Sequence, residues 1–147
     1  MKLEMVRDWM TPEPITITTD TILPEAHRLM MAHSIRRLPV IEGGQLVGIV
    51  TLGDVRGAEP SGATSLSIWE VNYLVSKLHV EEIMTPRPFT ISPNATLGEA
   101  AQMMLKYKVS GLPVVDEDRR VVGIITESDI FRMVVRDWLQ EAEPAQA

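Results

Sequence analysis

The length, composition and charge of this chain already exclude several classes of protein. Its 147 residues suit one sizeable core, and 45% of them are hydrophobic. The formal net charge of −6 argues against nucleic-acid binding, which needs clustered lysine and arginine side chains. With no cysteine, no apolar stretch long enough to cross a bilayer and no signal-peptide pattern at its start, the sequence predicts a cytoplasmic protein without membrane or disulfide chemistry.

The first half of the chain, residues 6–57, predicts the order strand, helix, strand, strand, helix. The apolar stripe of its first helix consists of Leu23, Ala26, Met30 and Met31. Pro24 suits the first turn of that helix, where no amide partner is lost. Gly43 and Gly44 then predict a tight turn between the two later strands.

Residues 58–79 form a predicted linker between the two halves. The stretch from Gly57 to Thr64 is small, polar and rich in turn residues, so we expect a surface loop. Ser67 opens a predicted helix whose apolar positions are 68, 71, 74, 75 and 78. At the end of the chain, residues 140–147 are expected to be a disordered tail.

The second half, residues 80–139, predicts the same order of elements. Residues 89–91 form a short extended run, closed by a turn at Pro93 and Asn94. Thr96 and Glu99 then have the spacing of a capping box, which satisfies unpaired amides at a helix start. The apolar stripe of this helix consists of Leu97, Ala100, Ala101, Met104 and Leu105.

Two buried strands and a final helix complete the second half. Gly111 is expected to stop the preceding helix, and residues 112–115 and 121–126 are expected to be buried strands around a solvated acidic turn. The final helix is expected from about Glu127 to Leu139. Its predicted inward positions are Ile130, Val134 and Trp138.

The two halves are copies of each other. When residues 10–45 are paired with 84–119, and residues 46–54 with 121–129, 18 of the 45 positions are identical. A repeat of this kind indicates a supersecondary unit that buries its apolar face against its copy. Strands joined through helices give a mixed sheet covered by helices. We therefore expect an α/β fold in which two halves pack sheet to sheet about a pseudo-two-fold axis and leave two symmetric clefts.

The most informative doubled motif is Gly-x-x-Thr-x-x-Asp, at residues 48–54 and 123–129. A glycine in a buried strand lets another group approach the backbone closely. The threonine lies where the strand turns into a helix, and the aspartate, Asp54 or Asp129, lies just inside that helix, where it can accept hydrogen bonds from a ribose diol. The same spacing is also that of a helix cap. Both interpretations stay open, because a duplication copies caps as readily as ligand sites.

These motifs together resemble the CBS domain, the regulatory motif named after cystathionine beta-synthase. The resemblance rests on the doubled Met-Thr-Pro at residues 10 and 84, on Leu-Pro-Val at residues 38 and 112, and on the doubled Thr-x-x-Asp. It covers nearly everything from about residue 6 to residue 132. Residues 63–70 further resemble the acetoin-utilisation type of CBS protein.

The resemblance implies a tandem pair, or Bateman module, that binds adenosine-containing ligands in its clefts. Asp54 and Asp129 would hold ribose hydroxyls, while Thr51 and Thr126 would face ribose or phosphate. The other implied nucleotide-binding residues, near the base or the phosphates, are Ile17, Thr18, Arg36, Arg37, Ile91, Ser92, Ser110, Gly111 and Leu112. Arg36 and Arg37 suit phosphate oxygens because each guanidinium offers several donors, and they could reach a phosphate chain from either cleft, so the two sites need not be equivalent. Surface arginines are also common without a ligand.

Catalysis is not expected, because the sequence offers no nucleophile with a matching base. The three histidines lack metal-ligand spacing, so neither a metal nor a required cofactor is predicted. The first functional hypothesis is a regulatory module that senses AMP, ADP or ATP, or alternatively S-adenosylmethionine, for an unidentified regulated protein. The second is a homodimerisation module whose clefts are vestigial and whose Thr-x-x-Asp motifs are caps only.

Overall fold

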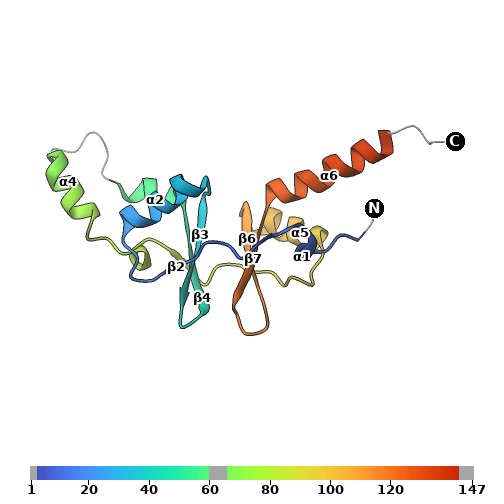
Figure 1. The fold of residues 1–147 in the computed structure, drawn as a ribbon, viewed down its shortest axis with the longest axis horizontal. Coiled ribbons are helices and arrows are strands. Elements are labelled where there is room, and N and C mark those ends of the chain that lie inside the picture. The colour runs from blue at the N-terminus through green and yellow to red at the C-terminus, as the bar shows by residue number, and fades with distance from the viewer. Residues whose placement is uncertain (1–2, 60–65, 143–147) are drawn as a thin grey trace. The chain divides into compact units, whose positions relative to one another are not determined.

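The computed structural model describes residues 3–59 and 66–142 and divides the chain into two compact units (Figure 1). The first-repeat unit is Pro14–Pro88, and the second-repeat unit combines Met1–Glu13 with Phe89–Ala147. Most of the predicted linker loop and of the predicted tail lies outside the described residues. Residues 3–13 therefore belong in space to the second repeat.

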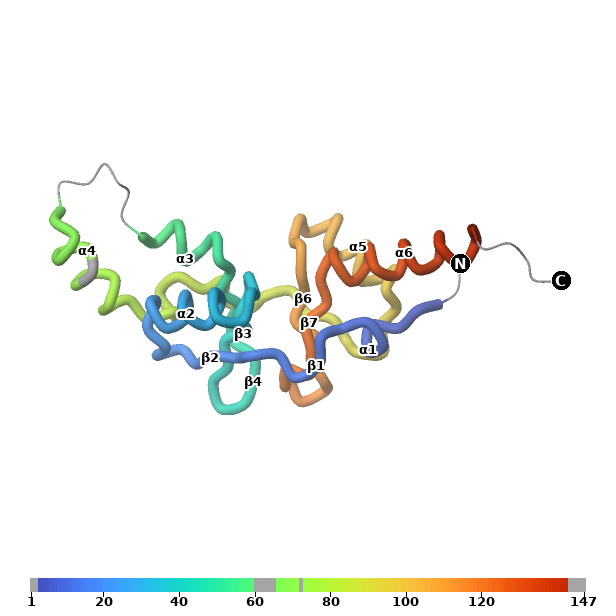
Figure 2. Tube along the Cα trace, turned by 45° about the horizontal axis from the view of Figure 1, so that its top comes forward, coloured from blue at the N-terminus to red at the C-terminus, as the bar shows by residue number. Residues whose placement is uncertain are grey.

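The first-repeat unit is built on a four-stranded sheet. Its order is β2-β3-β4-β5, with β2 parallel to β3 and the other neighbours antiparallel. The helices α2 and α3 lie over one face of this sheet, and α4 lies beyond them (Figures 1 and 2). The bounds are β2 Ile17–Thr18, α2 Leu23–His33, β3 Arg37–Glu42, β4 Gln45–Thr51, α3 Leu52–Ala58, α4 Ile68–Val75, the 3-10 helix η1 Val80–Glu82 and β5 Thr85–Pro86.

The second-repeat unit repeats this plan with a three-stranded sheet. Its order is β1-β7-β6, antiparallel throughout, and a single parallel bridge from Ile91 to Val114 stands where the first-repeat unit has β2. The bounds are α1 Val6–Trp9, β1 Thr11–Pro12, α5 Leu97–Tyr107, β6 Gly111–Val115, β7 Val121–Thr126 and α6 Glu127–Ala142. The predicted α/β fold with two copies of one unit is confirmed.

The helix starts follow the predicted chemistry. Thr96 caps α5 by accepting a hydrogen bond from the amide of Glu99 at 3.1 Å, and the Glu99 carboxylate accepts one from the amide of Thr96 at 3.0 Å. In α2, Pro24 occupies the first turn. These two helices therefore begin at equivalent places by different means.

Several details of the predicted helices are wrong. The helix α5 ends at Tyr107, because Lys108 takes a left-handed conformation, so Gly111 begins a strand instead of stopping the helix. The linker helix ends at Val75, before the predicted apolar position 78. The final helix continues to Ala142, three residues past the expected end.

The predicted apolar stripes are too wide. Leu97, Ala100 and Met104 are buried in the core, but Leu105 is 82% exposed. Its counterpart in the first repeat, Met31, is 52% exposed. A stripe at positions i, i+3, i+4, i+7 and i+8 spans more of the helix surface than one sheet covers, so its outermost position reaches solvent.

The segment before each repeat packs into the other repeat. Val6 and Val80 are both completely buried, the first in the core of the second-repeat unit and the second in the core of the first-repeat unit. Their amides donate to Ala95 and Thr21 at 2.9 and 2.8 Å. Figure 2 shows the blue N-terminal trace running beside β7 in this arrangement. The repeats are therefore exchanged at their N-terminal segments.

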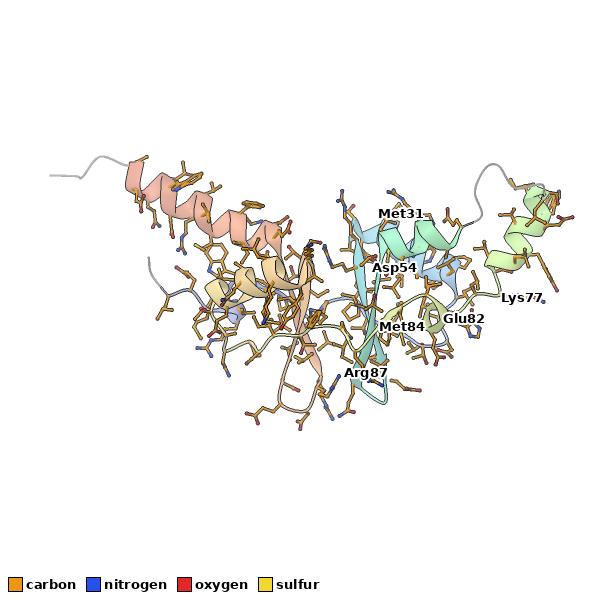
Figure 3. All side chains as sticks on the ribbon, turned by 180° about the vertical axis from the view of Figure 1, so that it is seen from behind. Met31, Asp54, Lys77, Glu82, Met84 and Arg87 are labelled. Atoms are coloured by element: carbon orange, nitrogen blue, oxygen red, sulfur yellow. The ribbon has the colours of Figure 1, made fainter. Side chains whose placement is uncertain are left out.

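The exchanged segments explain the glycines of the doubled motif. A Cβ atom on Gly48 would lie 3.0 Å from Met84 Cγ and 3.1 Å from the Thr85 carbonyl oxygen. On Gly123 it would lie 2.9 Å from Met10 Cγ, with the next residue's carbonyl oxygen at 3.0 Å. Figure 3 labels Met84 in the first-repeat unit. The close approach expected at each glycine is thus made by a methionine and its neighbouring backbone.

Among the described residues, no helix combines the length and the apolar character that crossing a bilayer requires.

Candidate functional site

The first-repeat site is the set Arg36, Arg37, Thr51 and Asp54, at the junction of β4 and α3. Thr51 Oγ1 accepts a hydrogen bond from the amide of Asp54 at 3.1 Å, and Asp54 Oδ2 accepts one from the amide of Thr51 at 2.9 Å. This reciprocal pair is a complete capping box. It holds the Asp54 carboxylate at the helix start, where Figure 3 labels it.

Strand pairing brings the two arginines to the same junction. Arg37 is the register partner of Thr51 across β3 and β4. The carbonyl oxygen of Arg36 accepts a hydrogen bond from the amide of Leu52, the first residue of α3, at 2.8 Å. The Arg36 side chain is exposed and that of Arg37 is half-buried. The backbone of two arginine residues therefore lies beside the helix start that also bears Asp54.

The second-repeat site is the equivalent set Ser110, Gly111, Thr126 and Asp129, at the junction of β7 and α6. Gly111 is the register partner of Thr126, and the carbonyl oxygen of Ser110 accepts from the amide of Glu127 at 3.1 Å. These two contacts match those of Arg37 and Arg36 one for one. The backbone framework of the two sites is therefore the same.

Asp129 is held more tightly than Asp54. Its Oδ2 atom accepts from the amide of Thr126 at 2.8 Å and from the Thr126 hydroxyl at 3.3 Å. Its Oδ1 atom pairs with a guanidinium nitrogen of Arg132 at 2.5 Å. Asp129 is 4% exposed, and an ionised carboxylate that is this buried requires such partners. Each carboxylate oxygen can accept two hydrogen bonds, so these contacts leave acceptor capacity for a ligand hydroxyl.

Four of the implied binding residues lie farther along the strands. Ile17 and Thr18 are register partners of Val40 and Ile41, three and four residues beyond Arg37 on β3. At about 3.3 Å per residue this places them roughly 10 to 13 Å away from Arg37. In the second-repeat unit Ile91 bridges to Val114, which gives the same spacing from Gly111, and Ser92 follows it in the chain. These residues belong to the other end of each strand pair.

All four of those residues are already engaged or buried, since Ile17 lies in the core of the first-repeat unit and the hydroxyl oxygen of Ser92 accepts a hydrogen bond from the amide of Asn94 at 3.1 Å. The hydroxyl of Thr18 donates to the carboxylate of Asp20, and this hydrogen bond lowers the pKa of Asp20. Ile91 is buried in the core, as is Leu112, whose side chain belongs to the same apolar cluster. Leu112 therefore supports the strand instead of presenting its side chain to a ligand, whereas Ser110 is exposed beside it.

Sequence reasoning missed Arg132. The spacing of Asp129 and Arg132 could have indicated this ion pair, because residues three positions apart in a helix lie on the same face. The equivalent position in the first repeat is Gly57, so the ion pair of Asp129 and Arg132 has no counterpart at Asp54. Among residues 3–59 and 66–142, no group of three or more histidine, aspartate or glutamate side chains is arranged to hold a metal ion.

Comparisons with known proteins identify the fold family and its relatives. The family model of the CBS domain matches residues 6–61 and again residues 80–136. A CBS domain-containing protein from Dictyostelium discoideum is 36% identical over 134 residues, which are 90% of this chain and 92% of that protein. Inosine-5'-monophosphate dehydrogenase from Korarchaeum cryptofilum is 40% identical over 117 residues, or 80% of this chain. The chain spans only about a fifth (21%) of that enzyme's length.

Solved structures show the same relationship. The CBS domain pair of protein MJ0100, in complex with 5'-methylthioadenosine and S-adenosyl-L-methionine, has a TM-score of 0.77 and 33% identity over 92% of this chain and 99% of that one. CBSX2 in complex with AMP has a TM-score of 0.76 and 29% identity over 92% and 98%. A Vibrio cholerae protein named for acetoin utilization (AcuB) has a TM-score of 0.76 and 32% identity over 97% and 100%. The predicted similarity to acetoin-utilisation proteins is therefore confirmed, and the chain belongs to the CBS domain family as a tandem pair.

Proposed function

We propose that this chain is a regulatory module that binds an adenosine-containing ligand, such as AMP, ADP, ATP or S-adenosylmethionine, through its two Thr-x-x-Asp sites. The observation that carries this proposal is the doubled placement of Asp54 and Asp129 at a helix start beside an exposed strand end. Held by the amide of the threonine at the helix start, the Asp54 carboxylate keeps acceptor positions for both hydroxyls of a ribose, and the Asp129 carboxylate keeps one. The adenosine ligands in the structures of MJ0100 and CBSX2 support the same ligand class.

The ligand acts by population shift in this proposal. A ligand that binds one arrangement of the chain better than another stabilises that arrangement, and a regulated protein reads the difference. In this proposal the chain catalyses no reaction. The adenosine-containing molecule is therefore a regulatory ligand and not a cofactor. The enzymes among the relatives carry the matching region as about a fifth of their length, which is consistent with a regulatory module attached to a separate catalytic part.

A thermal-shift screen with AMP, ADP, ATP, adenosine and S-adenosylmethionine tests the proposal. A ligand at 100 times its dissociation constant should stabilise the native state by about 2.7 kcal/mol, which is a shift of several degrees. Calorimetric titration should then show weaker binding in Asp54→Ala and Asp129→Ala, with little binding left when both are combined.

Glu99→Ala is the matched control. Glu99 completes the same kind of capping box as Asp54, but in α5, away from either site. This variant should lose a similar amount of stability and bind ligand as the wild type does. The proposal fails if none of the five ligands shifts the melting temperature, or if Glu99→Ala weakens binding as much as the aspartate variants do.

A second candidate function is assembly into a homodimer, and one observation favours it. The helix α6 carries an exposed apolar stripe in addition to its buried one. Its members are Phe131 at 65%, Val135 at 48%, Trp138 at 67% and Leu139 at 63% exposed. The predicted inward position of Trp138 is therefore wrong for the single chain. Apolar surface of this kind commonly marks an interface.

Light scattering after size exclusion tests this second candidate. The wild type should have the mass of two chains, and Phe131→Glu combined with Trp138→Glu should have the mass of one. Both residues are exposed, so the substituted chain should keep its fold. A wild-type mass of one chain at all practical concentrations removes the candidate. The two functions are compatible, since a ligand-binding module can also be a dimer.

A further inference from the structure

The two candidate sites share a backbone framework but carry different charges. At equivalent positions the first-repeat site has Arg36 and Arg37 where the second has Ser110 and Gly111. At the first position of the following helix, the second-repeat site has the exposed Glu127. The first-repeat site has leucine there. All three differences make the first-repeat site more positive.

In the second-repeat site, the guanidinium of Arg132 forms an ion pair with Asp129. The Arg132 guanidinium lies 2.5 Å from Asp129 Oδ1, so its charge compensates the buried carboxylate. The first-repeat site has glycine at that place, and its carboxylate is half-buried instead of buried. The backbone of Arg36 and Arg37 lies on the strand side of the junction, and no guanidinium is supplied three residues after Asp54.

Neighbouring charges do not reverse this difference. Lys108 lies two residues before Ser110 and adds one cation to the second-repeat site, where serine stands in the first repeat. Counting this lysine with Glu127, Asp129 and Arg132 gives a formal charge of zero (+1 − 1 − 1 + 1), against +1 for Arg36, Arg37 and Asp54 (+1 + 1 − 1). The acidic Asp20 of the first repeat follows β2, at the other end of the strand pair.

We infer that the two sites take different classes of adenosine ligand. The first-repeat site selects a ligand that carries phosphate, because two arginine residues whose backbone lies beside the helix start can add charge-assisted hydrogen bonds to phosphate oxygens. The second-repeat site gives phosphate no such advantage, because Glu127 repels it and Arg132 is committed to Asp129. It therefore takes a nucleoside without phosphate at least as well. This inference rests on the proposed function and names the ligand class of each site.

Single-site variants test the inference with AMP and adenosine as the two probes. Asp129→Ala leaves the first-repeat site to be measured by calorimetry, and Asp54→Ala leaves the second. The first of these proteins should bind AMP on the order of tenfold more tightly than adenosine, since charge-assisted hydrogen bonds are involved. This preference should fall as salt is raised. The second protein should bind the two probes with similar affinity.

Exchange of the charged residues gives the sharper comparison. In the Asp129→Ala background, Arg36→Ser with Arg37→Gly copies the second repeat and should remove most of the preference for AMP, because it should weaken AMP binding much more than adenosine binding. Arg36→Lys with Arg37→Lys keeps the positive charge and should retain part of the preference for AMP. Arg28→Ser, which removes an exposed cation from α2, is the control for net charge and should leave the preference unchanged.

Three results would overturn the inference. One is an equal preference for AMP in the two single-site proteins, and another is a preference that survives the serine and glycine exchange. The third is a wild type that binds neither probe, which would refute the proposed function itself and is distinguished from the others by that lack of any binding. Circular dichroism and melting temperature confirm that each variant is folded before its affinity is interpreted.

Discussion

The first-repeat and second-repeat units differ in their charged side chains much more than in their backbone contacts. The Met-Thr-Pro segments, the glycines beneath them and the strand-to-helix junctions recur in both units with matching hydrogen bonds. The cations do not recur, since Arg36 and Arg37 belong only to the first repeat and Arg132 only to the second. Duplication has thus kept the parts that hold each unit together, while the groups that would select a ligand have diverged.

The close approach at the two glycines should be equally important in both units. Gly48→Val and Gly123→Val should each destabilise the protein by about 3 kcal/mol, at the upper end of what overpacking costs, because the new side chain meets a backbone carbonyl as well as a methionine. Urea unfolding measures this effect. Gly57→Val, where a Cβ meets nothing within 4 Å, is the control and should cost much less.

A double substitution sharpens that result. Met84→Ala should offset part of the cost of Gly48→Val but none of the cost of Gly123→Val, which faces Met10. Full additivity of Met84→Ala with both glycine substitutions would contradict the described exchange of segments.

The exchanged valines should show which unit each segment stabilises. Val6→Ala and Val80→Ala each remove two buried methyl groups from a core, which should cost about 2 kcal/mol. Hydrogen exchange by mass spectrometry should show the loss of protection in β6 and β7 for Val6→Ala. For Val80→Ala it should appear in β3 and β4. If Val6→Ala instead lowered protection in β3 and β4, and Val80→Ala in β6 and β7, each segment would pack on its own repeat.

The cap at Thr51 should have a smaller effect. Thr51→Val removes the hydroxyl that accepts the amide of Asp54 and should cost about 1 kcal/mol. Thr96→Val, which removes the same kind of cap from α5, should cost a similar amount. A loss at Thr51 that clearly exceeds the loss at Thr96, in the absence of ligand, would show that Thr51 has a structural role beyond capping.

The smallest effect should come from a contact found in the second-repeat unit. The Arg136 guanidinium pairs with Glu4 and Asp137 and lies 4.9 Å from the centre of the Trp9 ring, and its hydrogen bond to Glu4 raises the pKa of Arg136. Arg136→Gln should lower the melting temperature slightly, by less than Thr51→Val, because the group is accessible to water. The difference should shrink in high salt, and a difference that grows with salt would contradict an ionic origin.

Much of the fold could be predicted from the sequence because local signals and the repeat agree. The capping box at Thr96 and Glu99 and the alternating burial of the strands depend on neighbours in the chain. The exchange of N-terminal segments could not be predicted, because Met10 and Gly123 are distant in sequence and only the fold brings them together. The exposure of Leu105 and Trp138 depends on how far the neighbouring elements extend over each helix, which periodicity does not report.

The candidate site was predictable in its residue types and less so in its geometry. The Thr-x-x-Asp spacing placed Thr51 and Asp54 correctly at a helix start, and the structure shows that they form a cap. A cap and a ligand site are compatible, because the same carboxylate retains acceptor positions. The ion pair of Arg132 was missed, because an exposed arginine in a helix has many possible partners and spacing alone does not choose one.

The most direct test of the account is hydrogen exchange by mass spectrometry with and without saturating AMP. With AMP we expect added protection in the peptides that carry residues 36–37 and 51–54, with a smaller change or none around residues 110–111 and 126–129. Repeating the measurement with adenosine should bring the two regions closer to equal protection. Unchanged exchange at both Thr-x-x-Asp junctions under ligand, or protection that appears only elsewhere in the chain, would contradict it.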